Sequence, residues 1–201
     1  ALASLTNIKT ISGRMERFGG GKLPLVVIDY AHTPDALENA LRTCKDLIRM
    51  NGTLMVVFGC GGNRDKAKRP AMGRIAELYA DVIYLTNDNP RTESPDTIIH
   101  DICLGITNVT SVHQIPDRSS AIDTAISNSV AHDIILIAGK GHETYQEING
   151  VRHDFDDMKI VKELLEQLSF QLRQLASIKV EILTLDLSEY DAADKVIKFI
   201  N

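Results

Sequence analysis

The chain has 201 residues, of which 44% are hydrophobic, and its formal net charge is −5. A chain of this length and composition can bury a substantial core in one domain, with or without an appendage. The acidic balance argues against a general nucleic-acid binder, whose surface needs an excess of Lys and Arg. Nothing in these numbers requires oligomerisation, and we expect a monomer.

The three cysteines, Cys44, Cys60 and Cys103, lie far apart and form no C-x-x-C pair. This spacing favours neither a zinc site nor a disulfide framework, and it fits a reducing cytoplasm. The longest apolar run, around Ile134 to Ala138, is far too short to span a bilayer. We therefore expect a cytoplasmic protein that has no metal site and does not associate with membranes.

Four apolar runs predict the strands of a sheet. Each is rich in β-branched residues and lacks polar alternation, which is typical of strands buried on both faces of a parallel sheet. The runs are Leu25–Ile28, Leu54–Phe58, Val82–Leu85 and Ile134–Ile137. Helical stripes lie between them in the ranges 35–50, 72–79, 97–106 and 119–129. The alternation predicts an α/β, Rossmann-like domain with a mostly parallel sheet and helices on both faces.

The C-terminal part predicts shorter elements. Residues 147–154 alternate around Asn149-Gly150, a dipeptide that favours a type I′ turn and therefore a short hairpin. A closing helix is expected over 158–168, then a strand over 178–185 and a helix over 192–200. We divide the chain into a domain of residues 1–168 and a tail of residues 169–201.

Unusual residues follow each of the four predicted strands. The segments are Asp29–Asp35, Gly59–Pro70, Asn87–Arg91 and Gly139–Glu143. In open α/β sheets, ligands bind beyond the carboxyl ends of the strands, where such loops converge. We therefore expect the four loops to share one edge of the sheet and to form one site.

Two of these loops suit anionic groups. The second combines glycines, which permit close backbone approach, with the cations Arg64, Lys66, Lys68 and Arg69. Composition alone, however, favours a solvated basic loop over an anion site. Residues 87–91 have the composition of a simple turn, but Arg91 adds a guanidinium that can pair with a carboxylate through two hydrogen bonds.

Several catalytic motifs are missing. Neither G-x-x-x-x-G-K-[ST] nor G-x-G-x-x-G occurs, so a phosphate cradle for ATP would lie elsewhere. No Ser or Cys is placed as a nucleophile beside His32, and Gln146 stands where H-E-x-x-H would need its second histidine. A histidine next to a strand end more often orders a loop through hydrogen bonds than acts as a catalyst. We expect this structural role for His32 and His142. We predict no catalytic residue and no metal ligand in this chain.

Five segments in this order resemble the C-terminal domain of the MurE group of the Mur ligase family. They are Gly13–Glu16, Asp29–Asp35, Gly59–Asp65, Asp88–Arg91 and Gly139–Glu143. The resemblance covers roughly Ala1 to Leu165 and implies the third of three domains. We therefore expect the chain, which starts at Ala1 without an initiator Met, to be part of a longer protein.

The resemblance also implies an activity. Ligases of this group add meso-diaminopimelate to UDP-N-acetylmuramoyl-L-alanyl-D-glutamate in peptidoglycan synthesis, through an acyl phosphate made from ATP. ATP and Mg²⁺ are held mainly by the central domain. The resemblance therefore implies that this chain is inactive by itself.

Residue by residue, the resemblance implies two sets of contacts. The amino acid would be received by Arg64, Asp88, Asn89, Arg91, Gly139 and Glu143. Residues that approach ATP when the domains close would be Arg14, Asp29, Tyr30 and His32. Physical chemistry agrees with the first set, because diaminopimelate differs from lysine by one carboxylate. A buried guanidinium left without that carboxylate would make lysine a poor substitute.

Two other functions stay open. One is a related ligase such as folylpolyglutamate synthetase, which should lack Asp-Asn-Pro-Arg at residues 88–91. The other is a non-catalytic module that binds an amino acid. From about Ser169 onward the resemblance ends. Residues 180–188 are faintly similar to a strand and acidic turn of a dinucleotide-binding dehydrogenase, and a fusion remnant explains the tail equally well.

Overall fold

The computed structural model describes residues 12–48 and 51–177. The chain divides into two compact units, residues 1–165 and 166–201, and all that follows on the site concerns the first unit. The boundary that we predicted at residue 168 stays a prediction. The strand and helix expected over 178–185 and 192–200 lie outside the described residues. No helix within the described ranges is long and apolar enough to cross a membrane.

Six strands form one sheet in the order β1-β2-β6-β3-β4-β5. They are β1 (Glu16–Gly19), β2 (Leu25–Asp29), β3 (Leu54–Phe58), β4 (Val82–Leu85), β5 (Val112–Gln114) and β6 (Ile134–Ala138). Only β1 is antiparallel to its neighbour. The mostly parallel, Rossmann-like sheet is therefore confirmed. The sequence did not predict β1 and β5, because both are short and partly exposed and neither has a continuous apolar run.

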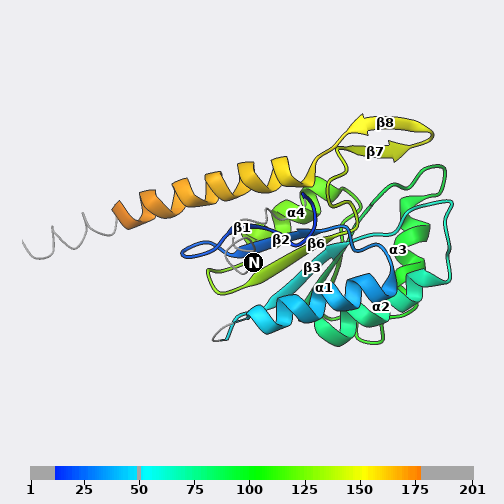
Figure 1. Cartoon of the computed structure of the whole chain (residues 1–201), viewed down its shortest axis with the longest axis horizontal. Coiled ribbons are helices and arrows are strands. Elements are labelled where there is room, and N and C mark those ends of the chain that lie inside the picture. The colour runs from blue at the N-terminus through cyan, green and yellow to red at the C-terminus, as the bar shows by residue number, and fades with distance from the viewer. Residues whose placement is uncertain (1–11, 49–50, 178–201) are drawn as a thin grey trace, which may run out of the picture. The chain divides into compact units, whose positions relative to one another are not determined.

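Four helices cover the sheet on both faces, as predicted (Figure 1). They are α1 (Pro34–Leu47), α2 (Lys68–Tyr79), α3 (Pro95–Cys103) and α4 (Arg118–Ser127). Two of them begin at a side-chain cap, where Thr33 accepts from the Ala36 amide and Asp117 from the Ser120 amide. The first three helices pack side by side, and α4 contacts β3, β4 and β6 from the opposite face.

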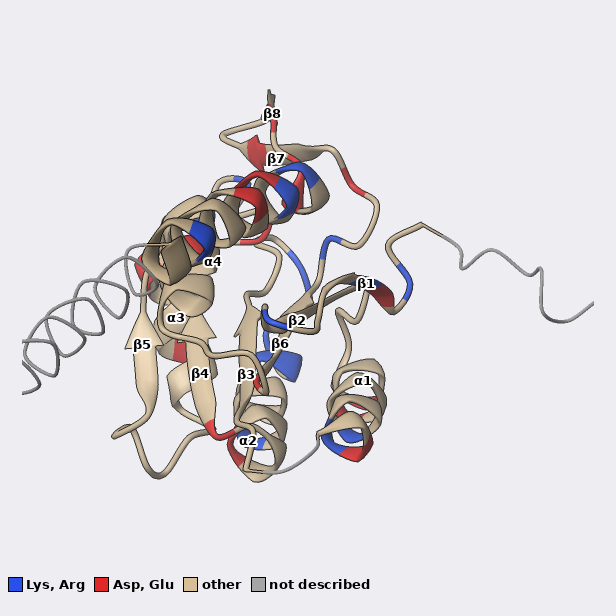
Figure 2. Ribbon diagram, turned by 90° about the vertical axis from the view of Figure 1, so that its left-hand side faces the viewer, with Lys and Arg blue, Asp and Glu red and all other residues tan. Residues whose placement is uncertain are grey.

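Strand β3 lies at the centre of the core and is buried at every residue. Leu54, Val56 and Phe58 belong to the main hydrophobic cluster with α1, α2 and α3. Met55 and Val57 alternate with them and therefore point toward the face covered by α4. Strands β3 and β4 contain no charged residue and are uncoloured along their length in Figure 2. Charged side chains of a site near these strands must therefore come from the loops.

The predicted hairpin is also confirmed, as β7 (Tyr145–Ile148) paired with β8 (Val151–Asp154). Its turn residues have φ angles of 50° at Asn149 and 77° at Gly150. Positive φ at both positions is what a type I′ turn requires. The closing helix runs over 157–177, beginning one residue before the predicted start and continuing beyond the predicted end.

A buried ion pair joins the first residue of this helix, Asp157, to the first residue of α4, Arg118. Arg118 and Asp157 are both fully buried, and their two hydrogen bonds measure 2.9 and 2.8 Å. The same guanidinium donates to the carbonyl oxygens of Ala138 at 3.1 Å and Asn87 at 3.4 Å. Those carbonyls lie where β6 ends and just beyond β4. The pair therefore fixes the start of two site-forming loops.

Breaking this pair should destabilise the fold strongly. We expect Asp157→Ala to lower the free energy of unfolding by about 3–5 kcal/mol, because Arg118 is left buried without its counter-ion. Replacing both partners, as Arg118→Met with Asp157→Leu, should recover most of that loss. The exposed control Arg42→Met should change stability by less than about 0.5 kcal/mol. Urea unfolding measures all three, and a loss below about 1 kcal/mol for Asp157→Ala would contradict the role of the pair.

Candidate functional site

The four loops meet in one pocket of about 570 Å³ at the carboxyl edge of the sheet. Its lining includes Tyr30 after β2, Arg64 after β3, Arg91 after β4 and Glu143 after β6. This convergence is what the sequence predicted. The volume is in the range of small-molecule sites. Both arginines face the same cavity and therefore can act on one ligand.

Arg91 is held in a defined orientation. Its backbone has a φ of 52°, its N–H donates to the Glu147 carbonyl at 3.0 Å, and its carbonyl accepts from Asn149 at 2.7 Å. Its side chain donates from Nη1 to the Gly62 carbonyl at 2.8 Å, and Nε lies 3.3 Å from a carboxylate oxygen of Glu147. Nη2 has no partner within the described part of the chain. The guanidinium is therefore fixed with one nitrogen left for a ligand.

The loop after β3 packs directly on the loop after β4. The Gly62 N–H donates to the Asn89 carbonyl at 2.8 Å, and a Cβ at Gly62 would overlap the Pro90 carbonyl oxygen. Only glycine permits this approach. The contact brings Arg64 close to the 88–91 segment, which explains why both arginines line the same pocket.

Arg69 does not serve a ligand, and our grouping of it with the ligand-binding cations was wrong. Its side chain is fully buried and donates to Glu93 at 3.0 and 3.1 Å and to Asp101 at 2.9 Å. A further bond reaches the Gly61 carbonyl at 3.3 Å. Arg69 therefore stabilises the loop after β3 through contacts inside the protein. Hydrophobic pattern alone could not show this, because its partners lie far along the chain.

The two lysines of the same loop also have partners in the protein. Lys66 lies 3.2 Å from Glu93, and Lys68 donates to the His32 carbonyl at 2.7 Å. Arg64 is exposed and makes no ion pair among the described residues. Of the four cations that the sequence singled out in this loop, Arg64 is therefore the one best placed to receive an anionic group.

Lys140 organises the other end of the pocket. Its side chain is fully buried, and Nζ donates to the Tyr145 carbonyl at 2.7 Å, to Asn89 Oδ1 at 3.0 Å and to Glu143 Oε2 at 3.4 Å. It also lies 3.5 Å from Asp88 Oδ1. Our predicted site residues included Gly139 and Glu143 but not Lys140. The available signal was a lysine between two glycines, just after an all-apolar strand.

Asn89 is occupied by contacts within the protein. Its Oδ1 also accepts from the Glu147 N–H at 2.9 Å, and its Nδ2 donates to Glu143 Oε2 at 3.0 Å. Glu143 Oε1 has no partner among the described residues, although the residue lines the pocket. Gly139 lines the pocket without a side chain, and a Cβ there would lie 3.9 Å from the Asp88 carboxyl carbon. No side chain at residue 139 therefore separates the pocket from the Asp88 carboxylate.

The residues predicted to approach ATP lie together but differ in exposure. Tyr30 and His32 line the pocket, whereas Arg14 lies beside it, with its guanidinium 4.9 Å from the Tyr30 ring centre. The Asp29 carboxylate is buried and accepts from the Met15 N–H at 2.9 Å, so it holds the loop that carries Arg14. A contact of any of these residues with ATP stays a prediction.

The ring contacts of this loop are mostly structural. His32 Nδ1 lies 2.9 Å from the Tyr30 carbonyl, which agrees with a loop-ordering histidine. Burial raises the pKa of Tyr30, and the negative charges of Glu143 and Asp88 raise it further. Tyr30 therefore keeps its proton at neutral pH and can donate a hydrogen bond into the pocket.

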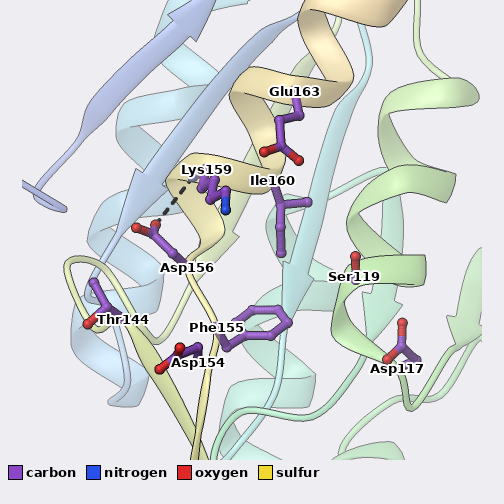
Figure 3. A pocket seen from close by; sticks show the side chains of 9 residues that line it. All are labelled: Asp117, Ser119, Thr144, Asp154, Phe155, Asp156, Lys159, Ile160 and Glu163. Carbon is purple, nitrogen blue, oxygen red and sulfur yellow. Dashed lines mark hydrogen bonds between the residues drawn. The ribbon is translucent and has the colours of Figure 1, made fainter.

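A second pocket, of about 580 Å³, lies between the start of α4, the end of β8 and the helix that follows (Figure 3). Its floor includes Phe155 and Ile160, and its charged side chains are mostly acidic. Two of those acids are already used, because Asp117 caps α4 and Asp156 accepts from the Met158 N–H at 2.9 Å. Lys159 is the single cation in this lining, which contains neither arginine of the first pocket. The first pocket is therefore the candidate binding site.

No group of three or more His, Cys, Asp or Glu side chains within residues 12–48 and 51–177 is arranged to hold a metal ion.

Fold and pocket together define an α/β domain with a pocket of mixed charge at the carboxyl edge of its sheet. The sequence profile of the family described as "Mur ligase, glutamate ligase domain" matches residues 13–141. The chain belongs to the Mur ligase family.

The chain is similar to several curated ligases. It is 50% identical over 165 residues to the UDP-N-acetylmuramoyl-L-alanyl-D-glutamate–2,6-diaminopimelate ligase of Chromobacterium violaceum, covering 82% of this chain and 33% of that protein. The ligase of the same name from Pseudomonas putida is 53% identical over 146 residues, covering 73% of this chain and 29% of that protein. The chain thus spans about a third of the length of these relatives.

Two solved structures that match the chain differ clearly in their similarity to it. A structure of a ligase of that name matches with a TM-score of 0.73 and 46% identity, covering 81% of this chain and 33% of that one. A bifunctional folylpolyglutamate synthase/dihydrofolate synthase with Mn, AMPPNP and L-glutamate bound matches at 0.52 and 20% identity, over 65% of this chain and 29% of that one. The latter likeness shows a shared fold alone, so the folylpolyglutamate alternative is not favoured.

The Arg69–Glu93 ion pair should make the free energy of unfolding depend on pH in the acid range. Hydrogen bonds from the Arg69 side chain and the Asn63 N–H lower the pKa of Glu93 from 4.5 to about 2. A carboxyl whose pKa is lowered by folding stabilises the fold above its unfolded pKa, and this contribution is lost as the pH falls toward the folded pKa. The window is therefore about pH 4.5 to 2.

We expect Glu93→Gln to be less stable than the natural chain at pH 7, and the difference to shrink as the pH falls through this window. Urea unfolding at several pH values measures it. Glu163→Gln is the matched control, because Glu163 is exposed and has no ion-pair partner among the described residues. A difference that stayed constant with pH would show that Glu93 does not act through its charge.

Proposed function

We propose that this chain is the amino-acid-binding domain of an ATP-dependent ligase that adds meso-diaminopimelate to UDP-N-acetylmuramoyl-L-alanyl-D-glutamate. The observation that carries the proposal is the charge pattern of the pocket. Its lining combines cations with carboxylates, namely Arg64, Lys68 and Arg91 with Asp65, Asp88 and Glu143. An amino acid head group has the complementary pattern, with a carboxylate beside an ammonium group.

The ligand contacts follow from the groups left without partners. Arg91 Nη2 and the exposed Arg64 would receive a carboxylate, and Glu143 Oε1 would receive an ammonium group. Diaminopimelate offers both at its distal end. Lysine offers only the ammonium group there, which would leave Arg91 Nη2 without a partner in a site where the side chain is 20% exposed. The pocket therefore supports selection of diaminopimelate.

In the proposed reaction, the diaminopimelate amine forms an amide bond with the activated D-glutamate carboxyl, and inorganic phosphate leaves. The amine loses its proton as the C–N bond forms. ATP, when bound with Mg²⁺, supplies the phosphoryl group that activates this carboxyl. The residues of this chain bind the amino acid, orient its amine and discriminate against lysine. We propose that it does so in the cytoplasm, as a monomer.

Only a few side chains at the edge of this domain are placed to contact ATP. The sequence has no phosphate-binding loop. Arg14 and His32 are exposed, and Tyr30 is stacked between Arg14 and the pocket, so these side chains could contact a nucleotide held by another domain. Asp29 would contribute indirectly, by holding the loop that carries Arg14.

Calorimetric titration of the chain tests the proposal. We expect meso-diaminopimelate to bind more tightly than lysine, and we expect no ATP hydrolysis, because the phosphate cradle is missing. Equal affinity for the two amino acids would argue against the assigned substrate. ATP turnover by the purified chain would contradict the assignment of the domain. Diaminopimelate binding by a longer natural protein without a P-loop would favour the non-catalytic module.

Arg91→Ala should remove the selectivity. Truncating one partner of a buried charged pair costs roughly 2–5 kcal/mol, and of the two amino acids only diaminopimelate brings a distal carboxylate to Arg91. We expect the ratio of the two affinities to fall by at least about tenfold, equivalent to ~1.4 kcal/mol. Arg74→Ala, an exposed arginine of α2, is the control and should leave the ratio unchanged. Equal losses for both amino acids would make Arg91 a general positioning residue.

A further inference from the structure

Lys140 is the only buried lysine among the residues that the structure describes. Removing an ammonium group from water is costly unless acceptors and opposite charges surround it. Here Nζ has three hydrogen-bond acceptors, matching the three protons of an ammonium group, at 2.7, 3.0 and 3.4 Å. These acceptors come from loops after β4 and β6 and from β7. Lys140 therefore connects the segments that build one half of the pocket.

The charges around Lys140 are unequal. It lies 3.5 Å from Asp88 and 3.4 Å from Glu143, so one cation stands between two carboxylates. The cluster keeps one surplus negative charge, which favours a cationic group in the pocket. Without Lys140, two neighbouring carboxylates would face each other, and one of them would take up a proton.

Lys140 also fixes the orientation of its partners. It binds Glu143 through Oε2 and Asn89 through Oδ1, and Asn89 Nδ2 donates to the same Oε2. Both donors therefore occupy one oxygen of Glu143 and leave Oε1 for a ligand. The amide of Asn89 can make these bonds in only one orientation, because its oxygen must face the ammonium group.

We propose that Lys140 is a positioning residue that keeps Asp88 and Glu143 charged together and presents Glu143 Oε1 to the ammonium group of the bound amino acid. The inference rests on the proposed function, because it deepens the description of the same pocket. Its alternative is a purely structural lysine, which would tie the loops together without affecting the charge of the site. The two roles differ in how ligand binding depends on pH.

Other charged or titratable groups surround the cluster. Arg118 lies near Asp88 and Glu143 but is paired with Asp157. Burial and the charges of Glu143 and Asp88 raise the pKa of Tyr30, so Tyr30 stays protonated at neutral pH. The Tyr145 ring faces the Lys140 ammonium group, and His32 and His142 pack near Tyr30. The histidines are common to all the variants below. Any pH dependence that they cause therefore appears equally in the natural chain.

Titration calorimetry of meso-diaminopimelate into the full chain between pH 6 and 8 is the test. We expect the affinity of the natural chain to change by less than about twofold in this range, whereas Lys140→Met should bind at least about tenfold more weakly at pH 6 than at pH 8. The double variant Lys140→Met with Asp88→Asn has the original surplus of one negative charge and should lose this pH dependence. Lys159→Met, an exposed lysine outside the pocket, should behave as the natural chain.

The outcomes separate the inference from the proposed function. If the natural chain binds no meso-diaminopimelate, both are overturned. If it binds but Lys140→Met shows the same pH profile, only the inference is overturned, and the same holds if the double variant keeps the pH dependence of the single one.

A second measurement needs no variant that could fail to fold. The buried ammonium protons of Lys140 should exchange slowly with water, so its ¹⁵Nζ signal should be visible in a lysine-labelled natural chain. We expect meso-diaminopimelate to shift this signal. Binding without a shift would overturn the inference.

Discussion

The carboxyl edge of this sheet depends on cations that are buried in protein and not solvated by water. Arg69, Arg118 and Lys140 have fully buried side chains, and each one bonds to a segment that forms or supports the pocket. A buried cation needs acceptors at defined distances, so its burial restricts where those segments can lie. The loops are held in place because moving any one of them would leave a charge without partners.

This arrangement has a consequence for ligand binding. Arg91 and Asn89 make most of their hydrogen bonds to neighbouring segments of the chain. Each side chain therefore has little freedom to reorient. Groups that are already fixed lose less conformational entropy when a ligand arrives. The contacts within the protein therefore do not compete with recognition. They select which atoms, such as Arg91 Nη2 and Glu143 Oε1, are available for it.

The sequence predicted those parts of the fold that local physics decides. The four buried strands have continuous apolar runs, and the alternation of residues 147–154 around Asn149-Gly150 predicts the hairpin. The shared edge of the loops followed from parallel topology. Strands β1 and β5 could not be predicted in this way, because their pairing with a neighbour and not their own pattern makes them strands.

The roles of the cations were harder to predict. Arg64 and Arg69 belong to the same predicted loop and have the same chemistry. In the structure, however, Arg64 is exposed at the pocket, whereas Arg69 lies in the first turn of α2 and is buried against Glu93 and Asp101. The difference arises from partners that are distant in sequence. Lys140 was missed for the same reason, because its importance depends on Asp88 and Asn89, which another strand brings to it.

We propose that the positive and negative side chains of this pocket hold the distal head group of diaminopimelate. A crystal structure of the chain with meso-diaminopimelate is the direct test. We expect a ligand carboxylate within hydrogen-bond distance of Arg91 and an ammonium group within hydrogen-bond distance of Glu143. A ligand bound in the pocket beside Phe155 and Ile160, or bound with its carboxylate against Glu143, would contradict it.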